Sequence, residues 1–338
     1  MVRIHAVVLI SLVFSGLAPL TAQTHWQVTN TFHIGGEGGW DYVTVDPSNH
    51  RFFVTRSTHT QAIDEQTGKV LADIPGQVRS HGVAVVPKVG RGFITDGGGS
   101  GAILVFDLKS YQVLGKLATM PDSDGIIYDP STNLVLAVSG DGNALMTFRP
   151  DIDPKNGRID PPIALGGAPE FLAADGTGKA WINLEDKDVV AVVDLHTRNV
   201  VARWPVAPGG HPVGMSIDEK AHRLFIGCRN PQKMIVMSTE TGKIEADLPI
   251  GAGVDATRVF RDQAFASCRD GSLTVIDEKA GNFNVAQTVK TADGAGTMGF
   301  DPMTRKIFLP TAEMLPAENG KRPQPKPETF EIVVLSEK

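Results

Sequence analysis

The chain has 338 residues, of which 41% are hydrophobic and 21% charged, and its formal net charge is −6 at pH 7. This balance is typical of a globular protein with a large core. A mildly acidic chain is not expected to have the broad basic surface by which nucleic-acid-binding proteins hold phosphates. With only two cysteines, the chain is not a small scaffold stabilised by disulfides.

The N-terminus has the layout of a secretory signal peptide over residues 1–22. The cation Arg3 precedes an apolar run at residues 6–20, and Ala22 offers a small side chain for cleavage. The run is shorter than the about 20 apolar residues that a membrane-spanning helix needs. We therefore expect a periplasmic or secreted mature chain, residues 23–338, that has no membrane span and is a monomer. A retained N-terminal anchor is the alternative.

An internal repeat runs through the mature chain. Its first copy contains four short β-type runs separated by turn residues, at 41–46, 51–56, 59–64 and 70–74. With Asp46 as the marker, the equivalent positions follow at intervals of 40 to 46 residues: Val86, Asp129, Asp175, Asp218, Phe260 and Asp301. Four-stranded units of this length are typical of WD40-like β-propeller blades. Seven such units predict an all-β, seven-bladed β-propeller.

The two ends of the chain predict how the ring closes. The seventh unit stops after the β-type run at 330–335 and has no fourth strand, whereas a spare strand at 26–34 precedes the first unit. We expect the spare strand to complete the last blade and cover its edge. Residues 23–338 would then form one propeller domain. An open solenoid would need capping elements, which the sequence lacks.

Two runs resemble a signature of a known repeat family. Phe53-Val54-Thr55-Arg56 and Phe93-Ile94-Thr95-Asp96 are similar to the Tyr-Val-Thr-Asn motif of the YVTN-type β-propellers. Other stretches resemble an exported bacterial branch of that family, among them Gly166-Gly167-Ala168-Pro169-Glu170-Phe171 and Gly227-Cys228-Arg229-Asn230. The resemblance implies a binding or scaffold protein and carries no shared catalytic set. One departure is Gly294-Ala295-Gly296-Thr297, where that branch tends to have an arginine at the third position.

Propeller geometry turns the repeat into a candidate site. The start of each inner strand and the end of the next strand meet at one mouth of the central channel. Four carboxylates and a histidine fall at the inner-strand starts, and three arginines lie in or near the second-strand ends. The predicted ligand-binding residues are therefore Asp41, His81, Asp124, Glu170, Asp255, Arg56, Arg229 and Arg269. Because four clustered carboxylates repel one another, they must hold protons, pair with cations or be separated by water.

A metal ion is one way to compensate this charge. Asp, Glu and His are suitable ligands for Ca²⁺ or Zn²⁺, and the predicted metal ligands are Asp41, Asp124, Glu170, Asp255 and His81. The structural alternative is that these groups hydrogen-bond neighbouring blades and waters trapped in the channel.

These features favour an exported, non-catalytic β-propeller that binds a small ligand, a metal ion or a partner protein at the funnel. No nucleophile–base pair can be identified, and the glycine-rich runs 35–39 and 97–101 lack the lysine and helix of a phosphate-binding loop. A metal-assisted hydrolase or lyase in the same funnel is the alternative. The long Pro-rich loop 313–328 is expected to be a flap or a partner contact. No nucleic-acid partner is expected.

The two cysteines are predicted to be free thiols. Cys228 and Cys268 occupy equivalent positions in neighbouring units. Adjacent sheets pack about 10 Å apart, whereas a disulfide needs Cα atoms within about 7 Å. Alkylation without reductant, followed by mass spectrometry, should therefore modify both cysteines. A Cys228–Cys268 bridge that survives in the unreduced sample would contradict the prediction.

Overall fold

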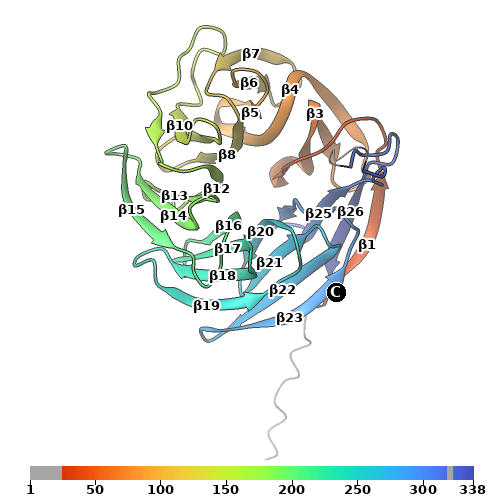
Figure 1. Cartoon of the computed structure of the whole chain (residues 1–338). Coiled ribbons are helices and arrows are strands. Elements are labelled where there is room, and N and C mark those ends of the chain that lie inside the picture. Colours follow the sequence, from red (N-terminus) through yellow and green to blue (C-terminus); the bar gives the residue numbers. More distant parts are fainter. Residues whose placement is uncertain (1–24, 318–322) are drawn as a thin grey trace, which may run out of the picture.

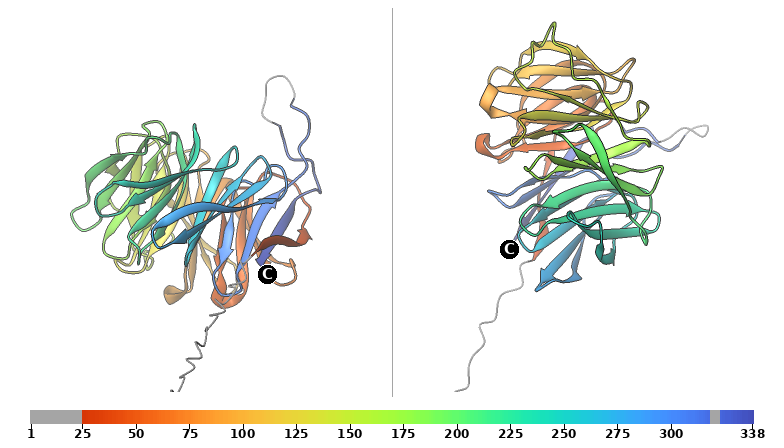
Figure 2. Two further views of the ribbon diagram at one scale, coloured as in Figure 1. Left: turned by 90° about the horizontal axis from the view of Figure 1, so that it is seen from below. Right: turned by 90° about the vertical axis from the view of Figure 1, so that its left-hand side faces the viewer.

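Six antiparallel sheets form a closed ring in the structure, a computed structural model that describes residues 25–317 and 323–338 (Figure 1). Seen from the side, the sheets stand next to one another around the central axis (Figure 2). Two short 3-10 turns, Pro47–Asn49 and Pro87–Val89, interrupt the strands. None of the helical segments described is long and apolar enough to cross a membrane. The predicted signal peptide, residues 1–22, lies outside the described residues.

Four of the sheets each contain four strands that follow one another along the chain. The first comprises β8 (Ser123–Asp129), β9 (Leu134–Ser139), β10 (Ala144–Phe148) and β11 (Ile163–Ala164). The second comprises β12 (Pro169–Ala174), β13 (Lys179–Leu184), β14 (Val189–Asp194) and β15 (Asn199–Pro205). The third comprises β16 (Pro212–Asp218), β17 (Arg223–Arg229), β18 (Gln232–Ser238) and β19 (Ile244–Pro249). The fourth comprises β20 (Val254–Phe260), β21 (Gln263–Cys268), β22 (Ser272–Lys279) and β23 (Asn282–Lys290).

The fifth sheet joins the two ends of the chain. Its order is β1-β26-β25-β24, with β1 at Trp26–His33, β24 at Gly299–Asp301, β25 at Lys306–Thr311 and β26 at Glu331–Glu337. β1 pairs antiparallel with β26 from Trp26↔Glu337 to His33↔Glu331. The prediction that the spare N-terminal strand completes the last blade is confirmed.

The sixth sheet corrects the predicted number of blades. It has six strands in the order β2-β3-β4-β5-β6-β7: β2 (Val43–Asp46), β3 (Arg51–Asp64), β4 (Val70–Val86), β5 (Arg91–Asp96), β6 (Ala102–Asp107) and β7 (Val113–Ala118). β3 pairs with β2 through its first half and with β4 through its second half, and β4 continues to pair with β5. The bridge Ser57↔Ser80 lies where a gap between two blades was expected. The first two repeat units therefore share one sheet, so that seven repeats give six sheets and not seven.

The core lies between neighbouring sheets rather than at the centre of the ring. Aromatic pairs join units that are neighbours in the ring: Phe93 meets Phe148 edge-on at 5.3 Å between ring centroids, and Phe52 stacks on Phe308 at 4.5 Å. β1 contributes to the clusters on both of its sides, because Trp26 packs with Phe265 and Phe32 packs with Phe52. Cys228 and Cys268 are both free and buried.

Closure by β1 generates a prediction about stability. Deletion of residues 27–34 should cause aggregation or a large fall in melting temperature, because it exposes the edge of β26. In the full chain, Trp26→Ala should lower the free energy of unfolding by about 3–5 kcal/mol, the usual cost of removing a large core aromatic. Val28, on the same strand, is 41% exposed, and Val28→Ala is the matched control. A truncated protein that stays monomeric with an unchanged melting temperature would refute closure by β1.

Candidate functional site

The inner-strand starts meet at one end of the channel around a cavity of about 490 Å³. Seven of the eight predicted ligand-binding residues line it: Asp41, His81, Asp124, Glu170, Asp255, Arg229 and Arg269. The cavity is also lined by four residues that were not among the predicted ligands: Tyr42, Glu185, His211 and Thr297. His211 and Glu185 form a pair, with 3.2 Å between Nε2 and Oε2. We call this cavity the funnel.

Arg56 does not line the funnel. Its side chain is fully buried, and its guanidinium donates hydrogen bonds to the Gly35, Glu37 and Gly39 carbonyls and to Gln61 Oε1. The guanidinium also lies over the Phe330 ring, 3.6 Å from its centroid. Burial lowers the pKa of Arg56 to about 10, so the group remains charged at neutral pH. It holds the glycine-rich loop before Asp41, and the structure does not bring it together with the other predicted ligand-binding residues.

The funnel residues are positioned by side chains from the preceding repeat unit. Thr55 Oγ1 donates to the His81 carbonyl at 2.7 Å, and Thr95 Oγ1 donates to the Asp124 carbonyl at 2.6 Å. Two further units make the same connection, through Asn183 Nδ2 to the Val213 carbonyl and Ser267 Oγ to the Gly296 carbonyl. We call these four buried donors, Thr55, Thr95, Asn183 and Ser267, the inter-unit latches. They fix the start of an inner strand relative to the unit before it.

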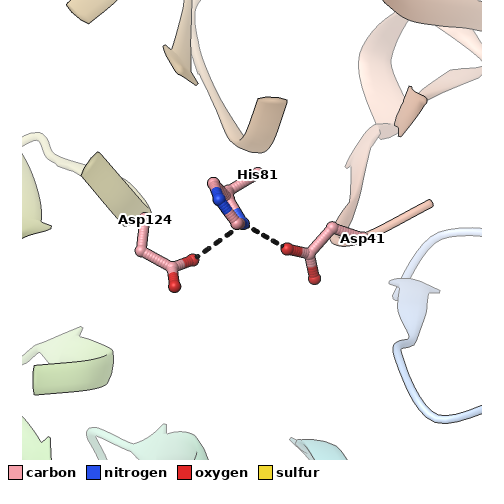
Figure 3. Close-up of side chains that lie close together, drawn as sticks. All are labelled: Asp41, His81 and Asp124. Carbon is pink, nitrogen blue, oxygen red and sulfur yellow. Dashed lines mark hydrogen bonds and ion pairs between the residues drawn. The ribbon is translucent and has the colours of Figure 1, made fainter. Parts of the chain in front are cut away.

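Asp41, His81 and Asp124 come closest together in the funnel. Figure 3 shows His81 between the two carboxylates, with its Nδ1 at 2.6 Å from Asp41 Oδ2 and 3.6 Å from Asp124 Oδ1. One potential ligand atom from each residue lies within 4.8 Å of the other two, which is close enough to share a metal ion. His81 Nε2 and Asp124 Oδ1 are buried and make no hydrogen bond. Buried polar atoms without a hydrogen-bond partner are rare in folded proteins.

Asp255 has a different role from the other carboxylates. Its two oxygens are held by Arg229 Nη2 and Arg269 Nε, and the aspartate is almost fully buried. Two cations therefore already neutralise it. Asp255 lies in the funnel wall with both oxygens held by arginines, whereas Asp41 and Asp124 pair with His81.

The remaining carboxylates carry an electrostatic cost. Burial raises the pKa of Asp124 to about 7, and the nearby Asp41 charge adds to this shift. Burial also raises the pKa of Asp41 and, together with the Asp124 charge, holds the pKa of Glu170 well above its usual range. For His81, burial lowers the pKa, but the hydrogen bond with Asp41 and the Asp124 charge raise it more. Burial and the neighbouring acids therefore both disfavour the charged forms of these carboxyl groups.

Comparison with known proteins shows the fold. No family model matches the chain, and no curated protein sequence matches it. Among solved structures, the WD40 repeats of RRP9 align with a TM-score of 0.74 at 12% identity, over 94% of this chain and 99% of that one. Hydrazine synthase of Kuenenia stuttgartiensis aligns with a TM-score of 0.70 at 14% identity, over 82% of this chain and 94% of that one. The chain is therefore a β-propeller, and its membership of the YVTN family stays a prediction.

The latches can be tested without touching a funnel side chain. Thr95→Val keeps the shape of the residue but leaves the Asp124 carbonyl and the Gly82 amide, which donates to Thr95 Oγ1 at 2.8 Å, without their partner. We expect a loss of about 1–3 kcal/mol in the free energy of unfolding. Thr241 is exposed, and Thr241→Val should change stability by no more than about 0.5 kcal/mol. Equal urea denaturation midpoints for the two variants would contradict the role of the latch.

Proposed function

We propose that the protein is an exported binding protein whose funnel holds a divalent cation between Asp41, His81 and Asp124. The observation that carries the proposal is the proximity of these three side chains, whose ligand atoms lie within 4.8 Å of one another. Asp124 Oδ1, a buried acceptor without a hydrogen bond, adds support, because a cation would give it the partner that it lacks.

The ligand set favours one kind of cation. A histidine nitrogen and two carboxylate oxygens are a common donor set for Zn²⁺, whereas Ca²⁺ takes six to eight oxygen ligands. Glu170 lines the same cavity and is a candidate for a further ligand among the predicted set. Asp255 is excluded from this role because two arginines hold its oxygens. We therefore favour Zn²⁺ over Ca²⁺.

The proposed export and the proposed binding role rest on different observations. The signal-peptide layout of residues 1–22 supports a periplasmic or secreted location. The resemblance to the exported branch of the YVTN-type propellers supports a binding role. The funnel leaves room beside the triad for a small molecule, since its volume is about 490 Å³, within the range of ligand pockets. The alternative is that a partner protein binds at the same face and occupies the funnel.

A metal-assisted hydrolase or lyase is the second candidate function. It is favoured by the number of protein ligands, because three donors leave a fourth zinc position open, as in catalytic zinc sites. Glu170, whose pKa is held well above its usual range by burial and by Asp124, could hold a proton there as a general acid. Turnover of ester or phosphoester substrates by the zinc-loaded protein, and its loss in Glu170→Gln, would favour this candidate.

The binding proposal predicts a metal-dependent change in thermal stability. A cation that binds only the folded protein at 100 times its Kd stabilises it by about 2.7 kcal/mol, so Zn²⁺ should raise the melting temperature of chelator-treated protein. Asp124→Asn should weaken binding at least about tenfold and remove most of this rise. Without metal, the same variant should be as stable as wild type or more stable, because it loses a repelling charge.

The control is an exposed aspartate on another part of the ring. The side chain of Asp151 is 64% exposed, and Asp151→Asn should keep the full response to Zn²⁺. No metal-dependent shift in the wild type would refute the cation site and leave a water-filled channel mouth as the better account. An equal shift in Asp124→Asn would place the metal elsewhere.

A further inference from the structure

A second cavity occupies the central channel between the inner strands. Its volume is about 460 Å³, which lies in the range of pockets for small organic ligands. Its wall is mainly apolar and comes from units around the whole ring, with side chains such as Val43, Val83, Ile127 and Met215. Neither the proposed metal site nor the latches use this space.

One cation faces this apolar space. Arg258, on β20, is the only charged side chain among the described residues that line the cavity. Its Nη1 donates to the carbonyl of its neighbour Thr257 at 2.7 Å, and its Cζ lies 5.8 Å from the centroid of the Phe171 ring. In the part of the chain that the structure describes, no carboxylate makes an ion pair with Arg258. Burial lowers the pKa of its guanidinium to about 10, so the group still carries its charge at neutral pH.

A hydroxyl without a hydrogen-bond partner belongs to the same cavity. Ser216 occupies the position in its repeat unit that Arg258 occupies in the next one, and it lines the same cavity. The residue is 9% exposed, and its Oγ is buried with no hydrogen bond. Equivalent positions in two other units carry Ala84 and Ala173, whose small side chains leave the middle of the channel open. An arginine without a carboxylate partner and a serine without a hydrogen-bond partner therefore line the same apolar space.

The channel cavity is separated from the funnel by an aromatic contact. Tyr42 lines the funnel and Phe171 lines the channel, and their rings meet edge-on with 5.2 Å between centroids. Arg258 lies on the channel side of this contact, over Phe171. A ligand of the channel is therefore chemically distinct from the cation proposed for the funnel.

We propose that the central channel binds an organic monoanion with an apolar body, such as a medium-chain or aromatic carboxylate, whose carboxylate contacts Arg258 and Ser216. The anion satisfies both unpaired groups, because a carboxylate accepts hydrogen bonds from the guanidinium and from the hydroxyl. The apolar body removes the Val, Ile and Met side chains of the wall from water. A polyanion does not fit, because Arg258 is the one cation among the described residues that line the cavity.

The test uses the full mature chain and thermal unfolding in chelator, which removes any metal ion from the funnel. Hexanoate, hexanol and chloride are added separately at constant ionic strength. Hexanoate at ten times its Kd should raise the melting temperature by about 2–3 °C. Hexanol, which has the same chain without the charge, and chloride, which has the charge without the chain, should have much smaller effects. An equal response to either would overturn the proposal.

Two variants show whether Arg258 and Ser216 hold the anion. Arg258→Met keeps an unbranched side chain but removes the charge, so it should abolish the response to hexanoate while leaving the protein folded. Ser216→Ala should weaken hexanoate binding several-fold, and Arg258→Lys should retain part of it. Arg258→Met that responds to hexanoate as wild type does would refute the assignment. Should Arg258→Met not fold, the other two variants still decide, because unchanged affinity in both would contradict the proposal.

Discussion

The hydrogen bonds that pass from one repeat unit to the next are the constraint on which the site depends. A β-propeller sheet contacts only its neighbours, so the position of each inner strand must be fixed locally. Here a buried Thr, Asn or Ser donates to the carbonyl at the start of the next inner strand. The side chains of His81 and Asp124 project from backbone held in this way. β1 closes the ring by pairing with β26. The sheets therefore cannot move apart to accommodate a small shift of one inner strand.

This arrangement explains why much of the funnel could be predicted from the sequence. The repeat aligns Asp41, His81, Asp124, Glu170 and Asp255 at one position in five of the seven units, and the similar backbone geometry of the units then brings equivalent positions to one mouth. The spare strand and the incomplete last unit likewise predict the pairing of β1 with β26. In each case the prediction rests on a regular spacing along the sequence, and the repeated backbone geometry brings the equivalent positions close together.

Where the prediction failed, the deciding interactions were not periodic. Arg56 aligns with funnel positions, yet carbonyls of the irregular glycine-rich loop and the Phe330 ring draw its side chain away from the cavity. The bridge Ser57↔Ser80 fuses two repeats into one sheet, and strand-like patterns do not reveal where hydrogen bonding stops. The pairing of Asp255 with two arginines also depends on rotamers of long side chains, which spacing alone does not fix.

The two cavities differ in the sign of their unsatisfied charge. The funnel holds half-buried carboxylates whose pKa values are raised by desolvation. The channel holds an arginine that has no carboxylate partner among the described residues. Tyr42 and Phe171 meet between them. A buried charge without enough compensation destabilises a folded protein, and this cost supports the proposals that the two regions are binding sites.

The central claim is that Asp41, His81 and Asp124 share a cation. Anomalous X-ray diffraction from crystals grown with Zn²⁺, recorded above and below the zinc absorption edge, tests it most directly. The account predicts one strong anomalous peak at about 2.0–2.2 Å from a ring nitrogen of His81 and from a carboxylate oxygen of each aspartate. Peaks confined to exposed surface histidines, with none in the funnel, would contradict it.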